Sequence, residues 1–131
     1  MPIDPSQVYV LLAADGSAAE LPGGEAFWSQ PGSELDRIGQ GWLVSEFECD
    51  ADWPNWEMHP DADEFVYLLS GEAVLKLQSE AGITRIPLKD RAAVVVPRGV
   101  WHTASVSAPS RMLFVTLGAG TQHRPVGAGP D

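Results

Sequence analysis

The chain has 131 residues, a length that suits one domain, and its 18 acidic and 8 basic residues give a formal charge of −10. Such an acidic surface repels phosphate backbones and anionic lipids, so we expect neither a nucleic-acid nor a membrane-surface role. No apolar run approaches the roughly 20 residues of a membrane span, and the first residues lack a signal-peptide pattern. Because Cys49 is the single cysteine, no internal disulfide is possible, and we expect a cytoplasmic protein.

The predicted elements are strands, because short apolar or alternating runs recur between turn signals and no helical period lasts three turns. In chain order they are expected at Val8–Leu12, Trp42–Glu48, Glu64–Leu69, Glu72–Gln78, Ile83–Ile86, Ala92–Val96, Trp101–Val106 and Arg111–Leu117. Ser70-Gly71 is typical of a hairpin turn, and tight turns are also expected at Glu80–Gly82 and Pro97–Gly99. The strand spacing predicts an all-β fold, a double-stranded antiparallel β-helix or jelly-roll barrel.

The domain organisation is expected to be simple. A single domain covers residues 1–131, with its core over 42–117. Residues 1–41 are expected to hold the first strand and an irregular segment rich in Gly and Pro. Residues 118–131 have a similar composition and are predicted to form a flexible tail in which His123 is exposed to solvent.

Side chains that could bind a metal or transfer a proton are concentrated between Glu57 and Glu64. Residues two apart in a strand share a face, so Glu57 and His59 are expected to point the same way. Pro60–Asp63 has strong turn chemistry, and an antiparallel return would set Glu64 beside that face. His102 follows another turn and begins a different strand whose start reaches the same pocket. Imidazole and carboxylate groups both bind first-row divalent metals.

These residues resemble the two sequence motifs of the cupin superfamily. The first cupin motif is His-x-His, then Glu after four residues and Gly after six more; here the same spacing holds Glu57, His59, Glu64 and Gly71. The second motif, Pro-x-Gly-x-x-His, is intact over Pro97–His102. The resemblance covers about residues 42–117. It implies that Glu57, His59, Glu64 and His102 are the ligands of one divalent metal ion.

The sequence departs from the cupin pattern at four positions. Ala51 and Arg91 replace glycines that often open the motifs, and Val106 replaces an Asn that often closes the second. Glu57 replaces the first ligand His, which leaves two imidazoles and two carboxylates. This harder ligand set favours Fe, Mn or Zn over Cu, with Ni as a further option. Without Glu57, two His and one carboxylate remain, the ligand pattern of non-haem Fe(II) oxygenases.

Several candidates also have plainer interpretations. Glu57 is either a ligand, a catalytic base beside the metal, or an exposed acid. Trp53, Trp56 and Trp101 flank the ligand segments, and core packing is favoured over cavity lining for them. Cys49 is interpreted as a small packing residue rather than a nucleophile.

The run Glu64–Leu69 is apolar on both faces, because Phe65, Tyr67 and Leu69 point away from the Glu64 face. A strand of this kind needs cover outside the barrel, from the N-terminal segment or from a second subunit. Since cupins commonly form dimers, the resemblance implies a homodimer.

The leading functional hypothesis is a metal-dependent enzyme that acts on a small polar molecule inside the barrel, with Glu57 as fourth ligand or general base. The family resemblance leaves dioxygenase or other oxidoreductase, isomerase and lyase chemistry open, and the two-His-one-carboxylate subset places oxidoreductases first. The alternative is a non-catalytic small-molecule or metal-binding sensor, or a barrel with a structural metal. A third hypothesis is that the Glu57 change marks a site that has lost its metal.

Overall fold

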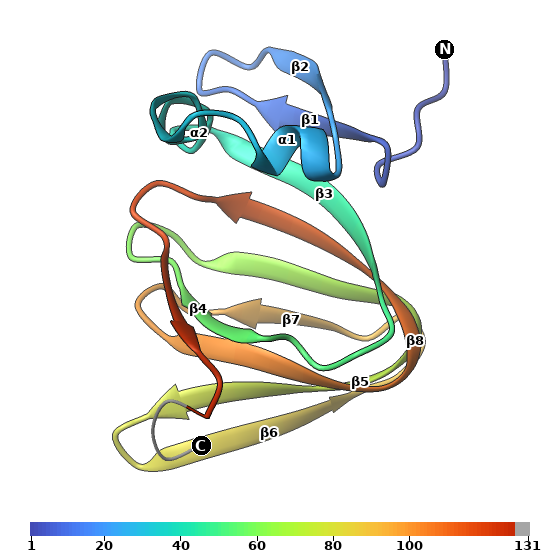
Figure 1. The fold of residues 1–131 in the computed structure, drawn as a ribbon, viewed down its shortest axis with the longest axis vertical. Coiled ribbons are helices and arrows are strands. Elements are labelled where there is room, and N and C mark those ends of the chain that lie inside the picture. The colour runs from blue at the N-terminus through green and yellow to red at the C-terminus, as the bar shows by residue number, and fades with distance from the viewer. Residues whose placement is uncertain (128–131) are drawn as a thin grey trace.

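The computed structural model describes residues 1–127, and that part of the chain forms a barrel of nine strands with two short helices (Figure 1). The strands are β1 (Val8–Leu12), β2 (Ala18–Pro22), β3 (Trp42–Cys49), β4 (Asn55–Met58), β5 (Glu64–Ser79), β6 (Gly82–Leu88), β7 (Ala93–Val96), β8 (Trp101–Leu117) and β9 (Gln122–Pro125). The helices are α1 (Glu25–Trp28) and α2 (Gly32–Ile38). The expected all-β jelly-roll class is confirmed.

The barrel wall has two halves, because β5 and β8 are long enough to pair with each other through both. One half has the strand order β2-β1-β3-β8-β5-β7 and uses residues 110–117 of β8. The other has the order β9-β4-β8-β5-β6 and uses residues 101–106 of β8. All of these pairs are antiparallel. Side chains that face inward from both halves pack into one apolar cluster, which includes Leu68, Leu75, Met112 and Phe114.

The hairpin expected at Ser70-Gly71 is wrong. β5 continues through both residues, and its register against β8 shifts there. Gly71 has a φ of 100°, and a Cβ added to it would lie 2.7 Å from Cα of Ser110 on β8. The two strands bend together at this point, on the side of the barrel where Figure 1 labels β5 and β8. A glycine that permits a bend and one that permits a turn give the same local sequence signal.

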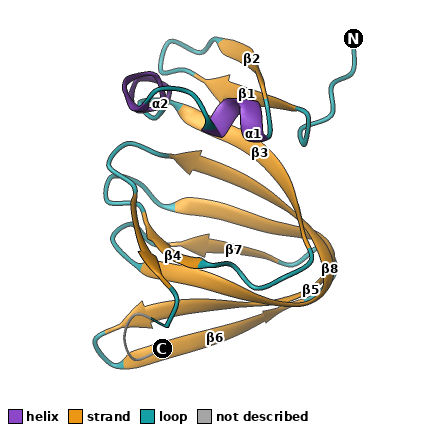
Figure 2. Cartoon of the chain, in the orientation of Figure 1, coloured by secondary structure: helices purple, strands orange, loops and turns teal. Residues whose placement is uncertain are grey.

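The N-terminal segment is more regular than expected, because it also contains β2 and both helices (Figure 2). Helices of four and seven residues are too short to produce a recognisable helical period. Together with Leu43 of β3, this segment builds a second apolar cluster of Tyr9, Phe27 and Ile38 above one end of the barrel. Among the described residues, no helix is long and apolar enough to cross a membrane.

The segment expected to be a flexible tail contains a strand in its described part, while His123 is exposed as expected. Gln122–Pro125 forms β9, which pairs with β4 in antiparallel register and sets His123 opposite Glu57. The side chain of Arg124 lies 5.4 Å from the centre of the Trp56 ring and 4.7 Å from that of Trp101, which adds cation–π contacts to the strand pairing. Residues 128–131, where the expected tail ends, lie outside the described part.

Candidate metal centre

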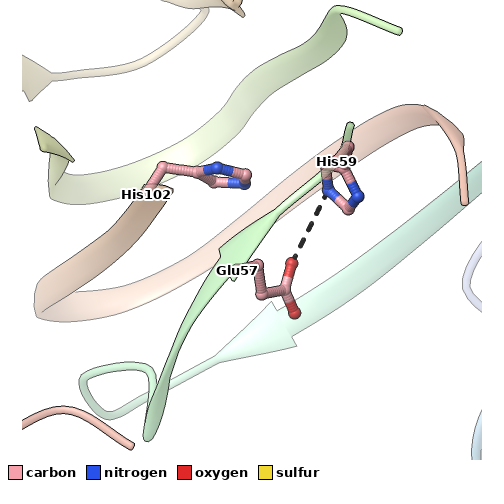
Figure 3. Close-up of side chains that lie close together, drawn as sticks. All are labelled: Glu57, His59 and His102. Carbon is pink, nitrogen blue, oxygen red and sulfur yellow. Dashed lines mark ion pairs between the residues drawn. The ribbon is translucent and has the colours of Figure 1, made fainter. Parts of the chain in front are cut away.

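The four predicted ligands come from three strands and lie together on the inside of the barrel. Glu57 is on β4, and its Cα pairs with that of His102 on β8. His59 follows β4 by one residue on the same face, and Glu64 opens β5 after the intervening turn. One ligand atom each of Glu57, His59 and His102 lie within 4.8 Å of one another, and Figure 3 shows these side chains converging.

Glu64 lies between the two imidazoles. Its Oε2 is 3.3 Å from Nε2 of His59, and its Oε1 is 3.1 Å from Nε2 of His102. The hydroxyl of Thr116 on β8 donates a hydrogen bond to Oε2. Because the Glu64 side chain is only 4% exposed, water contributes little to its solvation. Glu57 is farther away, with 3.9 Å between its Oε2 and Nε2 of His59, and its side chain is 34% exposed.

Hydrogen bonds fix the tautomers of both histidines. The carbonyl of Val100 can only accept, so Nδ1 of His102, 3.1 Å away, carries a proton. Thr121 Oγ1 donates to the carbonyl of Gly118 at 2.7 Å and therefore accepts from Nδ1 of His59 at 2.8 Å. In both neutral imidazoles the proton lies on Nδ1, and the lone pair of Nε2 points toward Glu64. Metal-binding histidines in proteins are typically oriented in this way.

The buried atoms of this cluster fit a cation. Nε2 of His59, Nε2 of His102 and Oε1 of Glu64 are buried without a hydrogen-bond partner, although they lie close together. Lone pairs that face one another at such distances repel unless a proton or a metal ion lies between them. Two imidazole nitrogens and a carboxylate oxygen form a donor set for Fe, Mn or Zn.

Protons would supply the countercharge in the metal-free protein. Burial by itself would raise the pKa of Glu64, but once Nε2 of His102 and His59 is protonated, hydrogen bonds and charge from these imidazoles outweigh burial and hold the pKa of Glu64 at about 2. Burial would lower the pKa of His102, whereas the Glu64 carboxylate outweighs this effect and raises it. The site therefore attracts positive charge in either form.

Two residues near the centre were missed by sequence reasoning. Thr121 holds His59, and Nε2 of His123 lies 3.4 Å from Oε1 of Glu57. The hydrogen bond with Glu57 raises the pKa of His123. Both residues belong to the segment expected to be a flexible tail, and nothing in its local composition signals that it pairs with β4.

A cavity of about 530 Å³ opens onto the centre, and Glu57, His59 and Glu64 form part of its wall. Trp53 also lines it, whereas Trp56 is buried in the wall of the barrel and 1% exposed. Trp53 therefore does both: it packs against the core cluster, as expected, and lines the cavity. Cys49 is half-buried beside this cavity, and burial raises the pKa of its thiol, which agrees with a packing role.

Comparisons with solved structures return barrels of the same kind. Pac13, a Streptomyces nucleoside dehydratase, aligns with a TM-score of 0.55 at 16% identity over 66% of this chain and 70% of its own. The hydroquinone dioxygenase PnpCD, in complex with Cd²⁺ and 4-hydroxybenzonitrile, aligns with a TM-score of 0.50 at 20% identity over 57% of this chain and 56% of its own. The Fe(II) form of HppE with substrate also gives 0.50, at 18% identity over 57% of this chain and 46% of its own.

At these identities the structural likeness concerns the fold alone. A comparison with proteins of curated function finds no match to this chain. The sequence pattern of one family, described as "Cupin domain", matches residues 44–118, more than half of the chain. The matched segment contains both motifs and all four converging side chains. The chain therefore belongs to the cupin family.

Proposed function

We propose that this protein is a metal-dependent enzyme that acts on a small molecule in the barrel, and that Glu57, His59, Glu64 and His102 hold one divalent metal ion. The observation that carries the proposal is the set of three buried, unpartnered atoms on His59, Glu64 and His102. A barrel without a metal would gain stability from apolar residues at these positions, since buried polar groups without partners are costly.

The geometry separates the ligands into a tight set and an outer carboxylate. Glu64 contacts both imidazoles within 3.3 Å, whereas Glu57 lies on the cavity side and is shared with His123. This arrangement supports a two-His-one-carboxylate set with Glu57 as an additional ligand or as the base that takes a proton from a bound molecule. A bound ion would supply Lewis-acid or oxygen chemistry there. The Glu57–His123 pair would accept and pass on the proton.

The fold indicates the position of the site more closely than it indicates the reaction class. Proteins of the same fold include a nucleoside dehydratase and a hydroquinone dioxygenase, so both elimination and oxidation occur on this barrel. We place dioxygenase or other oxidoreductase chemistry first, because His59, Glu64 and His102 match the ligand types of non-haem Fe(II) oxygenases.

Metal analysis of the purified protein tests the proposal. Wild-type protein prepared without chelator should carry about one equivalent of a divalent first-row metal, and Glu64→Gln and His102→Gln should lose most of it. Glu57→His restores the common cupin ligand set and should retain the metal. Thr84→Val, at an exposed position on β6, is the control. Wild-type metal below about a tenth of an equivalent after reconstitution would refute the centre.

A structural metal is the second candidate, and the observation that favours it is that one ligand atom of Glu57 lies within 4.8 Å of those of His59 and His102. If Glu57 joins the other three residues, four protein ligands close a tetrahedral shell, as in structural zinc sites. Water-proton relaxation of the Mn²⁺-loaded protein distinguishes the two candidates. An exchangeable water on the ion supports catalysis, and a closed shell supports the structural role.

The outer face of one half of the barrel supports a homodimer. An apolar row crosses five strands on the outside of the barrel. Its members lie opposite one another in register and are Val10, Val44, Val115, Phe65 and Val95. Phe65 and Val95 are 38% and 60% exposed. We propose that a second copy of this chain covers the row, because a self-complementary apolar face suits a two-fold interface. A cytoplasmic location stays a prediction from the single cysteine.

A further inference from the structure

The wall of the cavity is a continuous series of aromatic rings. The ring centre of Trp53 lies 6.4 Å from that of His102 and 5.7 Å from that of Phe114. Phe114 contacts Phe47 at 5.6 Å, and Phe47 stacks on Trp28 of α1 at 6.1 Å. All of these rings except His102 line the cavity, so flat apolar surface extends from the metal centre to the N-terminal helices.

The charge on the same wall is mainly negative. Among the described residues, the acidic side chains that line the cavity are Asp36, Glu48, Glu57 and Glu64, and no Lys or Arg joins them. His123 also lines it, and its pair with Glu57 raises the pKa of His123. Glu48 forms an ion pair with Arg111. Glu57 and Glu64 together balance the two charges of a divalent ion, and Asp36 offsets a protonated His123, so a loaded cavity would keep no net positive charge to attract an anion.

We propose that the ligand of this cavity is an uncharged, flat and mainly apolar molecule, such as a phenol, whose single polar end meets the metal centre. The inference rests on the proposed metal-dependent function and names its class of ligand. A volume of about 530 Å³ falls within the range of small-molecule pockets, roughly 300–1,000 Å³. The aromatic wall would bury the rings, and the polar groups of the site would orient the hydroxyl or carbonyl end. The sequence predicted a small polar molecule as the ligand. The cavity makes that expectation more specific, since it fits a molecule that is polar at one end.

Binding of matched probes tests the ligand class directly. p-Cresol and p-toluate share the para-methyl ring and differ at the polar end, a neutral hydroxyl against an anionic carboxylate, so the metal-loaded protein should bind p-cresol at least about tenfold more tightly. Titrations followed by the tryptophan indole NMR signals give both dissociation constants. Equal or tighter binding of p-toluate would overturn the proposal, as would failure of p-cresol to perturb any indole signal.

Two exposed positions show whether the probe occupies this cavity. Trp28→Ala removes a ring at the cavity mouth and should weaken p-cresol about two- to twelvefold. Trp42→Ala is the matched control, because Trp42 has similar exposure (38% against 50%) but does not line the cavity. Asp36→Lys should raise the affinity for p-toluate relative to p-cresol at low ionic strength. If both tryptophan variants weaken p-cresol equally, the cavity is not its site.

Metal analysis and probe binding together distinguish failure of this inference from failure of the proposed metal-dependent function on which it rests. Protein that binds the metal but prefers p-toluate would refute the ligand class and leave the metal centre intact. Protein that takes up no metal and still prefers p-cresol in the cavity would refute the metal centre and support the ligand class.

Discussion

Substituting Thr121 by Val should weaken metal binding, although Thr121 is not a ligand. Valine keeps the volume and branching of threonine, so the packing near β9 is preserved. It removes the acceptor of the Nδ1–H of His59, which lies 2.8 Å from Thr121 Oγ1. The His59 side chain is 7% exposed, so water cannot easily replace the lost partner. An unsatisfied buried donor costs about 1–3 kcal/mol, and loss of such a supporting contact typically lowers metal affinity about 10- to 100-fold.

The assay is competition for Zn²⁺ or Co²⁺ against a chromophoric chelator, with stability measured in parallel by urea unfolding. Thr121→Ser keeps the hydroxyl and should bind metal within about threefold of wild type. Ser110→Ala removes a buried hydroxyl that hydrogen-bonds to Ala108 and does not line the cavity, so it should change stability without changing metal affinity. If Thr121→Val binds metal as tightly as Thr121→Ser, the hydrogen bond between His59 and Thr121 does not orient the His59 ring.

Three further predictions concern pH, the strand bend and assembly. In metal-free protein, the free energy of unfolding should fall as pH drops from 4.5 toward 2, where Glu64 becomes protonated. It should also fall as pH rises above 6.5 through the raised pKa of His102. Urea unfolding across this pH range checks both changes. Gly71→Ala should destabilise the fold by at least about 2 kcal/mol more than Gly82→Ala in thermal unfolding, because both glycines have positive φ but only Gly71 faces a strand at contact distance. Phe65→Glu should convert the dimer to a monomer in sedimentation equilibrium, and a monomeric wild type at high concentration would contradict the proposed interface.

The converging side chains could be predicted from sequence because their spacing is local. Glu57, His59 and Glu64 lie within eight positions, and strand alternation with one turn suffices to bring them together. His102 required the family motif, since no local rule pairs it with Glu57. The structure brings all four together, and their binding of a metal remains a prediction.

The missed features depend on contacts between distant parts of the chain. β9 is short and polar, and it is a strand because β4 offers an unpaired edge. Thr121 and His123 were therefore placed in a flexible tail, although they support His59 and Glu57. Likewise, Gly71 gives no local sign of whether the chain reverses or bends, because that choice is set by the length of the strand that pairs with it.

The two long bent strands have a consequence for how the molecule comes apart. Since β5 and β8 each run through both halves of the wall, the two halves are joined by continuous backbone along both strands. Amide protons in the two halves should therefore exchange with solvent at similar rates under native conditions, through one cooperative opening. The N-terminal cluster around Tyr9 is joined to that wall by the pairing of β1 with β3, so its amides are expected to exchange earlier than those of β5 and β8.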